Sequence, residues 1–221
     1  MAERPILFNT EMVRAILEGR KKATRRIVKA KGYNITGIPS WAMFRRNPDD
    51  FFFDVCTTGN EPSAKTATTI LIESPARPGD VLYVRETWCA LPVSPGGHIR
   101  IPDRYYYRAD PELRPEAWRG KWRPSIHMPK EAARLFLRVT DVRCERLQEC
   151  GKGWCTDIEA EGVQTPQKPI LYINDDAYHN ALREEMQKLW DSTIKPVDIQ
   201  RYGWAANPWV WVIEFERCEK P

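Results

Sequence analysis

Lys21 and Thr24 are three positions apart inside a strongly basic stretch, residues 19–26. Neighbouring positive charge and partial burial both disfavour the ammonium form of a lysine, so Lys21 has surroundings suited to a base that takes a proton from a hydroxyl. Thr24 would supply that hydroxyl as a nucleophile. The same spacing also suits a simpler arrangement, in which Lys21 anchors a phosphate and Thr24 is an ordinary strand or turn residue. On spacing alone we favour the simpler arrangement.

Two carboxylates are candidates to complete such a site, because a glutamic acid in a cleft can protonate a leaving group or hold a substrate amine. Glu161 ends a short predicted helix, and Glu86 ends an apolar strand. Each has a structural alternative. Glu86 would form an ion pair with an arginine of the basic stretch, and Glu161 would be a solvated helix residue.

The basic stretch is part of a longer cluster, since eight basic residues and one acid lie between Arg14 and Lys31. Such a cluster attracts phosphate and raises the local concentration of anions. Arg20, Arg25 and Arg26 are therefore candidates for phosphate contacts or for ion pairs. A solvated helix end is the alternative.

The segment 122–129 carries an aromatic ring, a guanidinium, a hydroxyl and an imidazole on a chain stiffened by proline, as is common for segments that line sites. Tryptophans could stack on a base, which is worth roughly 1–3 kcal/mol per base. Taken singly, each tryptophan is better explained by core packing, and the histidine by an orienting or structural role. The candidates for ligand contact are Trp88, Trp122, Arg123, Ser125, His127 and Trp209.

Composition narrows the class of protein. The 221 residues are 42% hydrophobic, enough for a packed core, and the net charge of +4 is too small for a general nucleic-acid coat. No apolar run approaches the length that spans a bilayer, and the N-terminus lacks a signal-peptide pattern. The sequence thus predicts a cytoplasmic protein with reduced cysteines and no membrane partner. The spacing of Cys and His predicts no metal site, and no cofactor is expected.

The pattern of elements predicts an α+β fold with a small closed or nearly closed sheet. Strands are expected at 5–8, 81–88, 105–109, 135–147 and 209–215, and helices at 10–17, 157–162 and 175–191. The last strand shows little alternation, which indicates burial on both faces. A single domain, 1–221, is expected, with an inserted hairpin region at 31–75 and a Pro/Gly-rich insertion at 89–130.

The stretch Gly-Arg-Lys-Lys-Ala-Thr-Arg-Arg at 19–26 resembles the G-x-K-x-x-T-x-R signature of ASCH domains, relatives of the PUA RNA-binding fold. The resemblance continues in order at 79–84, 159–163 and 211–215 and spans nearly the whole chain. With its long insertions and the Asn-Pro-Trp-Val-Trp run at 207–211, the chain is similar to ASCH proteins carried by bacteriophages and prophages. The resemblance implies a small β-barrel with flanking helices and a basic cleft.

The enzymatic branch that the chain resembles is the bacterial N4-acetylcytidine amidohydrolase, which uses a lysine base, a threonine nucleophile and a glutamate acid. Lys21 and Thr24 match the first two, Glu161 is the best match for the third, and Glu86 is the reserve. The leading hypothesis is therefore removal of an acyl group from a modified nucleobase or nucleoside. The alternatives are a non-catalytic module that binds RNA, single-stranded DNA or a modified base, and, third, a ribonuclease.

Overall fold

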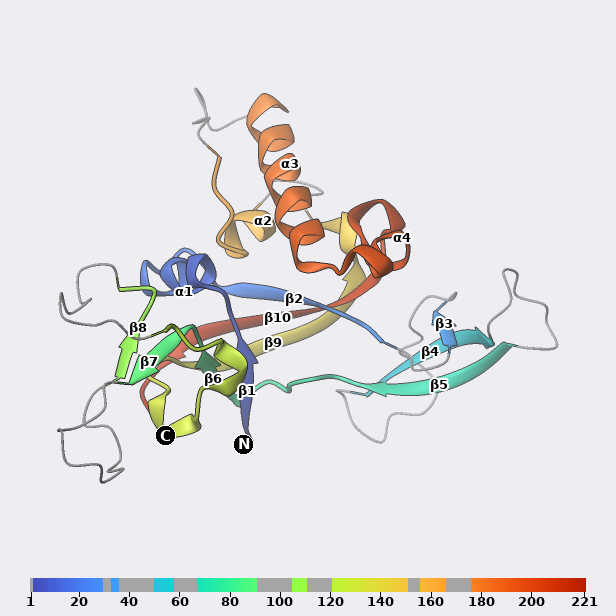
Figure 1. The fold of residues 1–221 in the computed structure, drawn as a ribbon. Coiled ribbons are helices and arrows are strands. Elements are labelled where there is room, and N and C mark those ends of the chain that lie inside the picture. The colour runs from blue at the N-terminus through green and yellow to red at the C-terminus, as the bar shows by residue number, and fades with distance from the viewer. Residues whose placement is uncertain are drawn as a thin grey trace, which may run out of the picture.

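The fold was analysed in a computed structural model, which describes residues 2–29, 33–35, 50–57, 67–90, 105–110, 121–150, 156–165 and 176–221. Its main element is a curved five-stranded sheet with the order β1-β6-β9-β10-β2 (Figure 1). The β1–β6 pair is parallel and the others are antiparallel. The strands are β1 (Glu3–Leu7), β2 (Ala23–Ile27), β6 (Val81–Arg85), β9 (Phe136–Arg146) and β10 (Trp209–Cys218).

Strand β10 lies inside this sheet and is buried on both faces, which explains its unbroken apolar sequence. Trp211, Ile213 and Phe215 belong to a core cluster shared with β1 and α1 (Thr10–Leu17). Val210 and Val212 point the other way, because successive strand side chains alternate, and join a second cluster under the later helices. The expectation of a buried terminal strand is confirmed.

Those later helices cover the second face of β10, in the upper part of Figure 1. Leu182 and Met186 are buried on one side of α3, as the helical spacing predicted. The helices are α2 (Thr156–Ala160), α3 (Asp176–Thr193) and the short α4 (Ile199–Tyr202).

The connection between β1 and β2 forms as the sequence predicts. The side chain of Asn9 caps α1 by accepting a hydrogen bond from the Met12 amide at 2.8 Å. The helix stops near Gly19, whose φ of 75° favours glycine. Helix α1 thereby connects the two edge strands of the main sheet.

Two smaller sheets fall within the predicted insertions. Strands β3 (Tyr33–Ile35), β4 (Asp50–Thr57) and β5 (Ala67–Glu73) form an antiparallel sheet that projects from the main sheet (Figure 1). Strands β7 (Trp88–Ala90) and β8 (Tyr105–Tyr107) form an antiparallel pair. The sequence predicted one strand over 81–88, but the chain breaks it at Glu86 and Thr87 into β6 and β7.

The fold is therefore α+β, as expected. No helix in the described ranges combines the length and apolar character needed to cross a bilayer.

Candidate functional site

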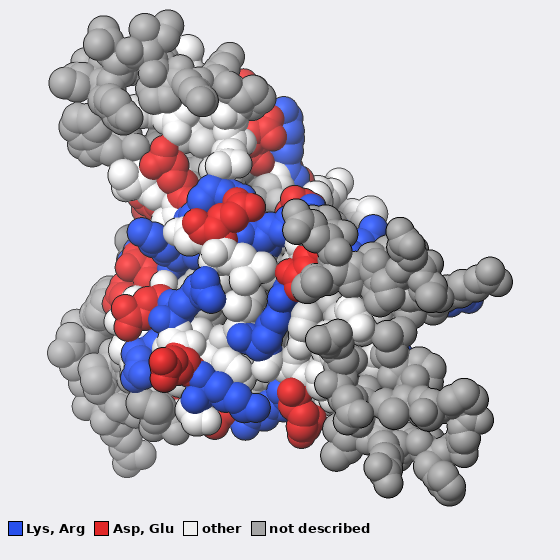
Figure 2. Space-filling model, turned by 90° about the vertical axis from the view of Figure 1, so that its left-hand side faces the viewer, with Lys and Arg blue, Asp and Glu red and all other residues white. Residues whose placement is uncertain are grey.

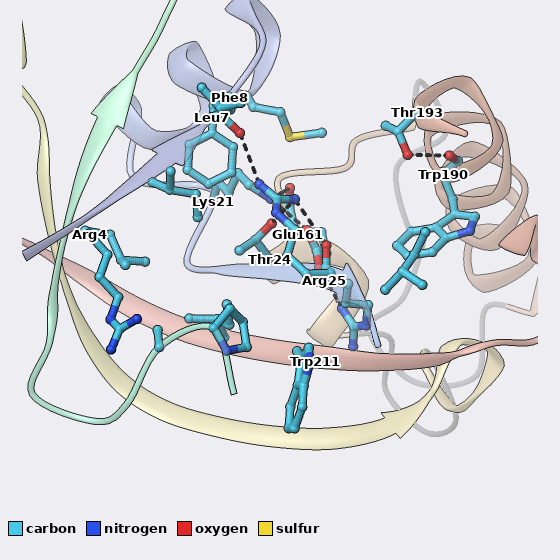
Figure 3. Close-up of a pocket in the computed structure, with 18 of the residues that line it drawn as sticks. Arg4, Leu7, Phe8, Lys21, Thr24, Arg25, Glu161, Trp190, Thr193 and Trp211 are labelled. Atoms are coloured by element: carbon cyan, nitrogen blue, oxygen red, sulfur yellow. Dashed lines mark hydrogen bonds and ion pairs between the residues drawn. The ribbon is translucent and has the colours of Figure 1, made fainter. Parts of the chain in front are cut away.

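A cavity of about 650 Å³ opens between the two edge strands of the main sheet, β1 and β2, and helix α3 (Figure 3). Lys21, Thr24 and Glu161 all line it. Lys21 lies just before β2, Thr24 lies within it, and Glu161 directly follows α2. Lys21 and Glu161 are 140 positions apart in the chain. The fold thus brings three of the four predicted catalytic residues to one cavity.

Lys21 and Glu161 meet through both their backbones and their side chains. They form an isolated antiparallel bridge, and the Lys22 amide donates to Ala160 O at 2.7 Å. Lys21 Nζ lies 2.7 Å from Glu161 Oε2. It also donates to the carbonyls of Glu161 at 2.9 Å and Ala23 at 2.8 Å. Three oxygen acceptors surround Nζ, which satisfies all three donors of an ammonium group.

Burial is the largest influence on the pKa of Lys21 and lowers it from its ordinary value. The Glu161 carboxylate opposes this shift, whereas the cations Arg26 and Arg25 add to it, and the net direction is downward. The sequence-based expectation of a depressed lysine pKa thus has its cause in the structure. The lysine is held in an ion pair with the Glu161 carboxylate.

Arg25 fixes Glu161 from the other side. Its Nη1 donates to Glu161 Oε1 at 3.1 Å, and its Nε and Nη2 donate to Glu145 Oε1 at 3.2 and 2.8 Å. The carboxylate of Glu161 is therefore held by two cations, one on each oxygen. Arg25 is committed to these acids, so its role is to orient Glu161.

Thr24 and Arg26 lie on the opposite face of β2. Thr24 is paired with Ile213 and Arg26 with Trp211, so their side chains join the inner face of the curved sheet. Arg26 Nη1 donates to Thr24 Oγ1 at 3.0 Å. No hydrogen bond joins the described side chains of Lys21 and Thr24, so an attack by Thr24 requires a bound substrate or a water to complete the proton path.

Arg26 also spans the gap between the two edge strands. Its Nη2 donates to Leu7 O of β1 at 3.1 Å, and its Nη1 donates to Arg25 O of β2 at 3.1 Å. A single guanidinium that lines the cavity thus connects the two strands.

The strand β2 presents its unpaired edge at this gap. Val28 N donates to Trp209 O at 3.0 Å and Phe215 N donates to Lys22 O at 2.9 Å. Because hydrogen-bonded positions alternate along an antiparallel edge strand, the backbone groups of Ala23, Arg25 and Ile27 point away from β10. Two of these backbone carbonyls accept hydrogen bonds from side chains. Lys21 Nζ donates to Ala23 O, and Arg26 Nη1 donates to Arg25 O.

Several lining residues carried no signal in the sequence. Phe8 lies under two cations, with Lys21 Nζ 5.5 Å and Arg26 Cζ 5.4 Å from its ring centroid. Trp190 reaches the cavity from α3 (Figure 3). The spacing of these residues fits ordinary core positions, and only the packing of β1 and α3 beside β2 makes them line a cavity.

The other predicted ligand contacts lie elsewhere. Arg20 is not among the described lining residues of the cavity, and it pairs with Glu18 and donates to Gly162 O at 2.9 Å. Trp209 is buried and its ring lies 4.5 Å from Arg146 Cζ. The 122–129 segment packs near β7, where Trp88 and Arg123 form a bridge, and it does not join the described lining. Trp122, Ser125 and His127, the other predicted ligand contacts on this segment, are likewise not among the described lining residues.

Glu86, the reserve acid, also lies outside the described lining of the cavity. It is buried and accepts two bonds from Arg134, at 2.9 and 3.1 Å. The expected ion pair therefore exists, but its partner is Arg134 rather than an arginine of the basic stretch. Burial raises the pKa of Glu86, and Arg134 partly opposes that shift.

Among the described residues, no group of three or more His, Cys, Asp or Glu is arranged to hold a metal ion. Comparison of the chain with protein-family models, curated proteins and solved structures found no match.

Proposed function

We propose that this protein is an amidohydrolase that removes an acyl group from a modified nucleobase or nucleoside such as N4-acetylcytidine. The observation that carries the proposal is the meeting of Lys21, Thr24 and Glu161 in one cavity, with Lys21 Nζ 2.7 Å from Glu161 Oε2. The cavity volume of about 650 Å³ is in the range of small-ligand sites. Phe8, Trp190 and Trp211 supply apolar lining for a planar base.

In the proposed reaction, Thr24 Oγ attacks the amide carbonyl carbon while Lys21 accepts the hydroxyl proton through a bound water or a group of the substrate. Glu161 gives a proton to the departing amine nitrogen, which leaves an acyl ester on Thr24. Water then hydrolyses the ester, and the products are the free amine and a carboxylic acid. The bond from Arg26 to Thr24 Oγ1 supports this role, because a cationic donor stabilises negative charge on that oxygen.

These roles require a particular distribution of protons. Lys21 must be neutral to act as a base and Glu161 must be protonated to act as an acid, so the proton of the pair must lie on Glu161. The 2.7 Å contact allows that transfer without outside water. Burial lowers the pKa of Lys21, which favours the neutral form that a base requires.

Incubating the protein with N4-acetylcytidine and following release of cytidine and acetate tests the proposal. Wild type should turn over, and Lys21→Ala should not. Absence of turnover by wild type, or equal turnover by the variant, would refute it.

The family assignment is part of the same proposal. A PUA-like barrel of the ASCH type is supported by the curvature that brings β1 and β2 close enough for Arg26 to bond Leu7 O at 3.1 Å. It is supported further by Lys21, Thr24 and Arg26, which stand at the lysine, threonine and arginine positions of the signature.

A non-catalytic binding module is the second candidate. The observation in its favour is that Lys21 Nζ is already surrounded by three acceptors, as a structural ammonium would be. Figure 2 shows basic and acidic side chains interspersed over the described part of one face, which favours a discrete ligand over a long nucleic-acid track. Affinity for single-stranded RNA that falls steeply with salt, without turnover of the acetylated nucleoside, would support this candidate.

A further inference from the structure

The cations that line the cavity differ in their partners. Arg4 contacts Asp80, Lys21 contacts Glu161, and Arg25 contacts Glu145 and Glu161. Arg26 and Lys29 have no carboxylate within ion-pair distance among the residues that the structure describes. Both line the cavity. No carboxylate of the described residues therefore neutralises the positive charge of these two side chains.

Arg26 is held in place by neutral groups. Its guanidinium donates to Thr24 Oγ1, Arg25 O and Leu7 O at 3.0 to 3.1 Å. These bonds use three of the five N–H groups of an arginine, so Nε–H and one N–H of Nη2 have no acceptor among the described residues and can bind a ligand. The head group is thus oriented in advance in the lining of the cavity.

A half-buried guanidinium without a counterion is unfavourable, because desolvating a charge is costly when only neutral groups replace the water. In agreement, burial lowers the pKa of Arg26, and Glu161 only partly opposes the shift. An anionic ligand would supply the missing counterion. Lys29 is exposed near the end of β2 and would add a second charge from the solvent side.

We infer that Arg26 and Lys29 form an anion subsite of the cavity, and that the ligand is a nucleoside monophosphate rather than an uncharged nucleoside. The inference rests on the proposed function, since it names the substrate class of the same cavity. A phosphate monoester carries about −1.5 to −2 charges at pH 7, which matches two cations. The amide of Ile27, which points to the unpaired edge of β2, is a further donor beside Arg26.

The cavity also favours a mononucleotide over a longer strand. Among the described cations that line the cavity, Arg4, Lys21 and Arg25 are paired with carboxylates, so Arg26 and Lys29 are left to bind a phosphate. Both of these cations line the one cavity, whereas a strand would need further cations in line along the edge.

Calorimetric titration of cytidine and of cytidine 5′-monophosphate into the wild-type protein tests the inference. We expect the monophosphate to bind at least about 10-fold more tightly, as one bidentate, charge-assisted contact allows. In Arg26→Gln the two ligands should bind about equally. Arg20→Gln is the matched control. It removes the same charge from the same basic stretch, at a residue that is not among the described lining of the cavity.

Since Arg26 connects two strands, the folding of Arg26→Gln is checked by circular dichroism and thermal unfolding. Lys29→Gln provides an independent variant, because an exposed side chain can be changed without loss of packing. It should reduce the preference for the monophosphate several-fold. Loss of the preference in Arg26→Gln and its decrease in Lys29→Gln, with Arg20→Gln unchanged, would support the subsite.

Equal binding of both ligands by wild type, absence of binding by either, or an unchanged preference in both variants would overturn the inference. So would an oligocytidine that binds far more tightly than the monophosphate. These ligands carry no acyl group, so the measurement is independent of turnover. A monophosphate preference without deacetylation would refute the proposed chemistry alone, and deacetylation without the preference would refute the subsite alone.

Discussion

Lys21 and Glu161 are joined by an antiparallel backbone bridge and by an ion pair of 2.7 Å between Nζ and Oε2. The backbone bridge fixes the relative positions of the two Cα atoms, so the charged groups lose little further rotational freedom when they form the ion pair. Arg25 holds the other carboxylate oxygen at 3.1 Å. The site is therefore oriented before any ligand arrives, which is the condition for efficient acid–base chemistry.

Replacing Lys21 should abolish hydrolysis without unfolding the protein. Lys21→Met keeps the apolar stem near Phe8, and Glu161 retains Arg25 as a partner, so the buried carboxylate does not become isolated. We expect a loss of at least about 100-fold in kcat/KM for N4-acetylcytidine, which is the lower end for removal of a general base. Lys22→Met, at an exposed neighbouring position, should retain activity and is the control.

Glu161 and Glu145 offer a matched pair, because both bind Arg25 but Glu161 also contacts Lys21 and lines the cavity. Glu161→Gln should lower kcat by about 100-fold or more, since an amide cannot donate the proton of a carboxylic acid. Glu145→Gln should reduce stability while changing kcat little. Steady-state kinetics and urea unfolding of both variants check this, and equal kinetic losses would show that Glu161 acts only by positioning Arg25.

Gly162 follows Glu161 and has a φ of 83°. A Cβ at this position would lie 2.9 Å from Ala15 Cβ and 3.0 Å from Lys21 Cβ, so Gly162→Ala should press on Lys21 as well as strain the backbone. Gly79→Ala is the control, because Gly79 has a φ of 89° and a Cβ there would meet open space.

Both variants should lose roughly 1–2 kcal/mol from the left-handed backbone. Gly162→Ala should lose about 1–3 kcal/mol more from overpacking and should lower activity. Chemical denaturation and kinetics measure the two effects. Equal destabilisation of the two variants would contradict the close approach to Lys21.

Asp80 makes the free energy of unfolding depend on pH in the acid range. Burial alone would raise its pKa, but bonds from the Ala2 and Arg77 amides and the contact with Arg4 lower it overall. Because the folded-state pKa lies below the unfolded-state value of about 3.9, the unfolded state binds more protons between the two. Stability from Asp80 is therefore present above pH 4 and lost as the pH falls through the folded-state pKa.

The free energy of unfolding, measured by urea denaturation from pH 7 to pH 2.5, should fall less steeply in Asp80→Asn than in wild type. Asp141→Asn, at a side chain that is 52% exposed, is the control and should follow the wild-type curve. An unchanged slope in Asp80→Asn would contradict this account.

Local patterns in the sequence were sufficient for α1 and β10. The asparagine cap and Gly19 determine the limits of α1, and the two-sided burial of β10 follows from its unbroken apolar run. The break at Glu86 and Thr87 was not predictable in this way. It depends on Trp88 turning to bridge Arg123, a contact with a distant segment.

The sequence by itself determined which residues are chemically capable, because the basic stretch concentrates a lysine, a threonine and arginines within residues 19–26. The tertiary structure decided which of them lie together. Alternation along β2 places Arg25 toward Glu145 and Glu161 and places Arg26 on the opposite face, beside Thr24. The contact across 140 positions places Glu161 beside Lys21, whereas Glu86 pairs with Arg134, because a carboxylate's partner depends on the packing of distant segments and not on its neighbours in the chain.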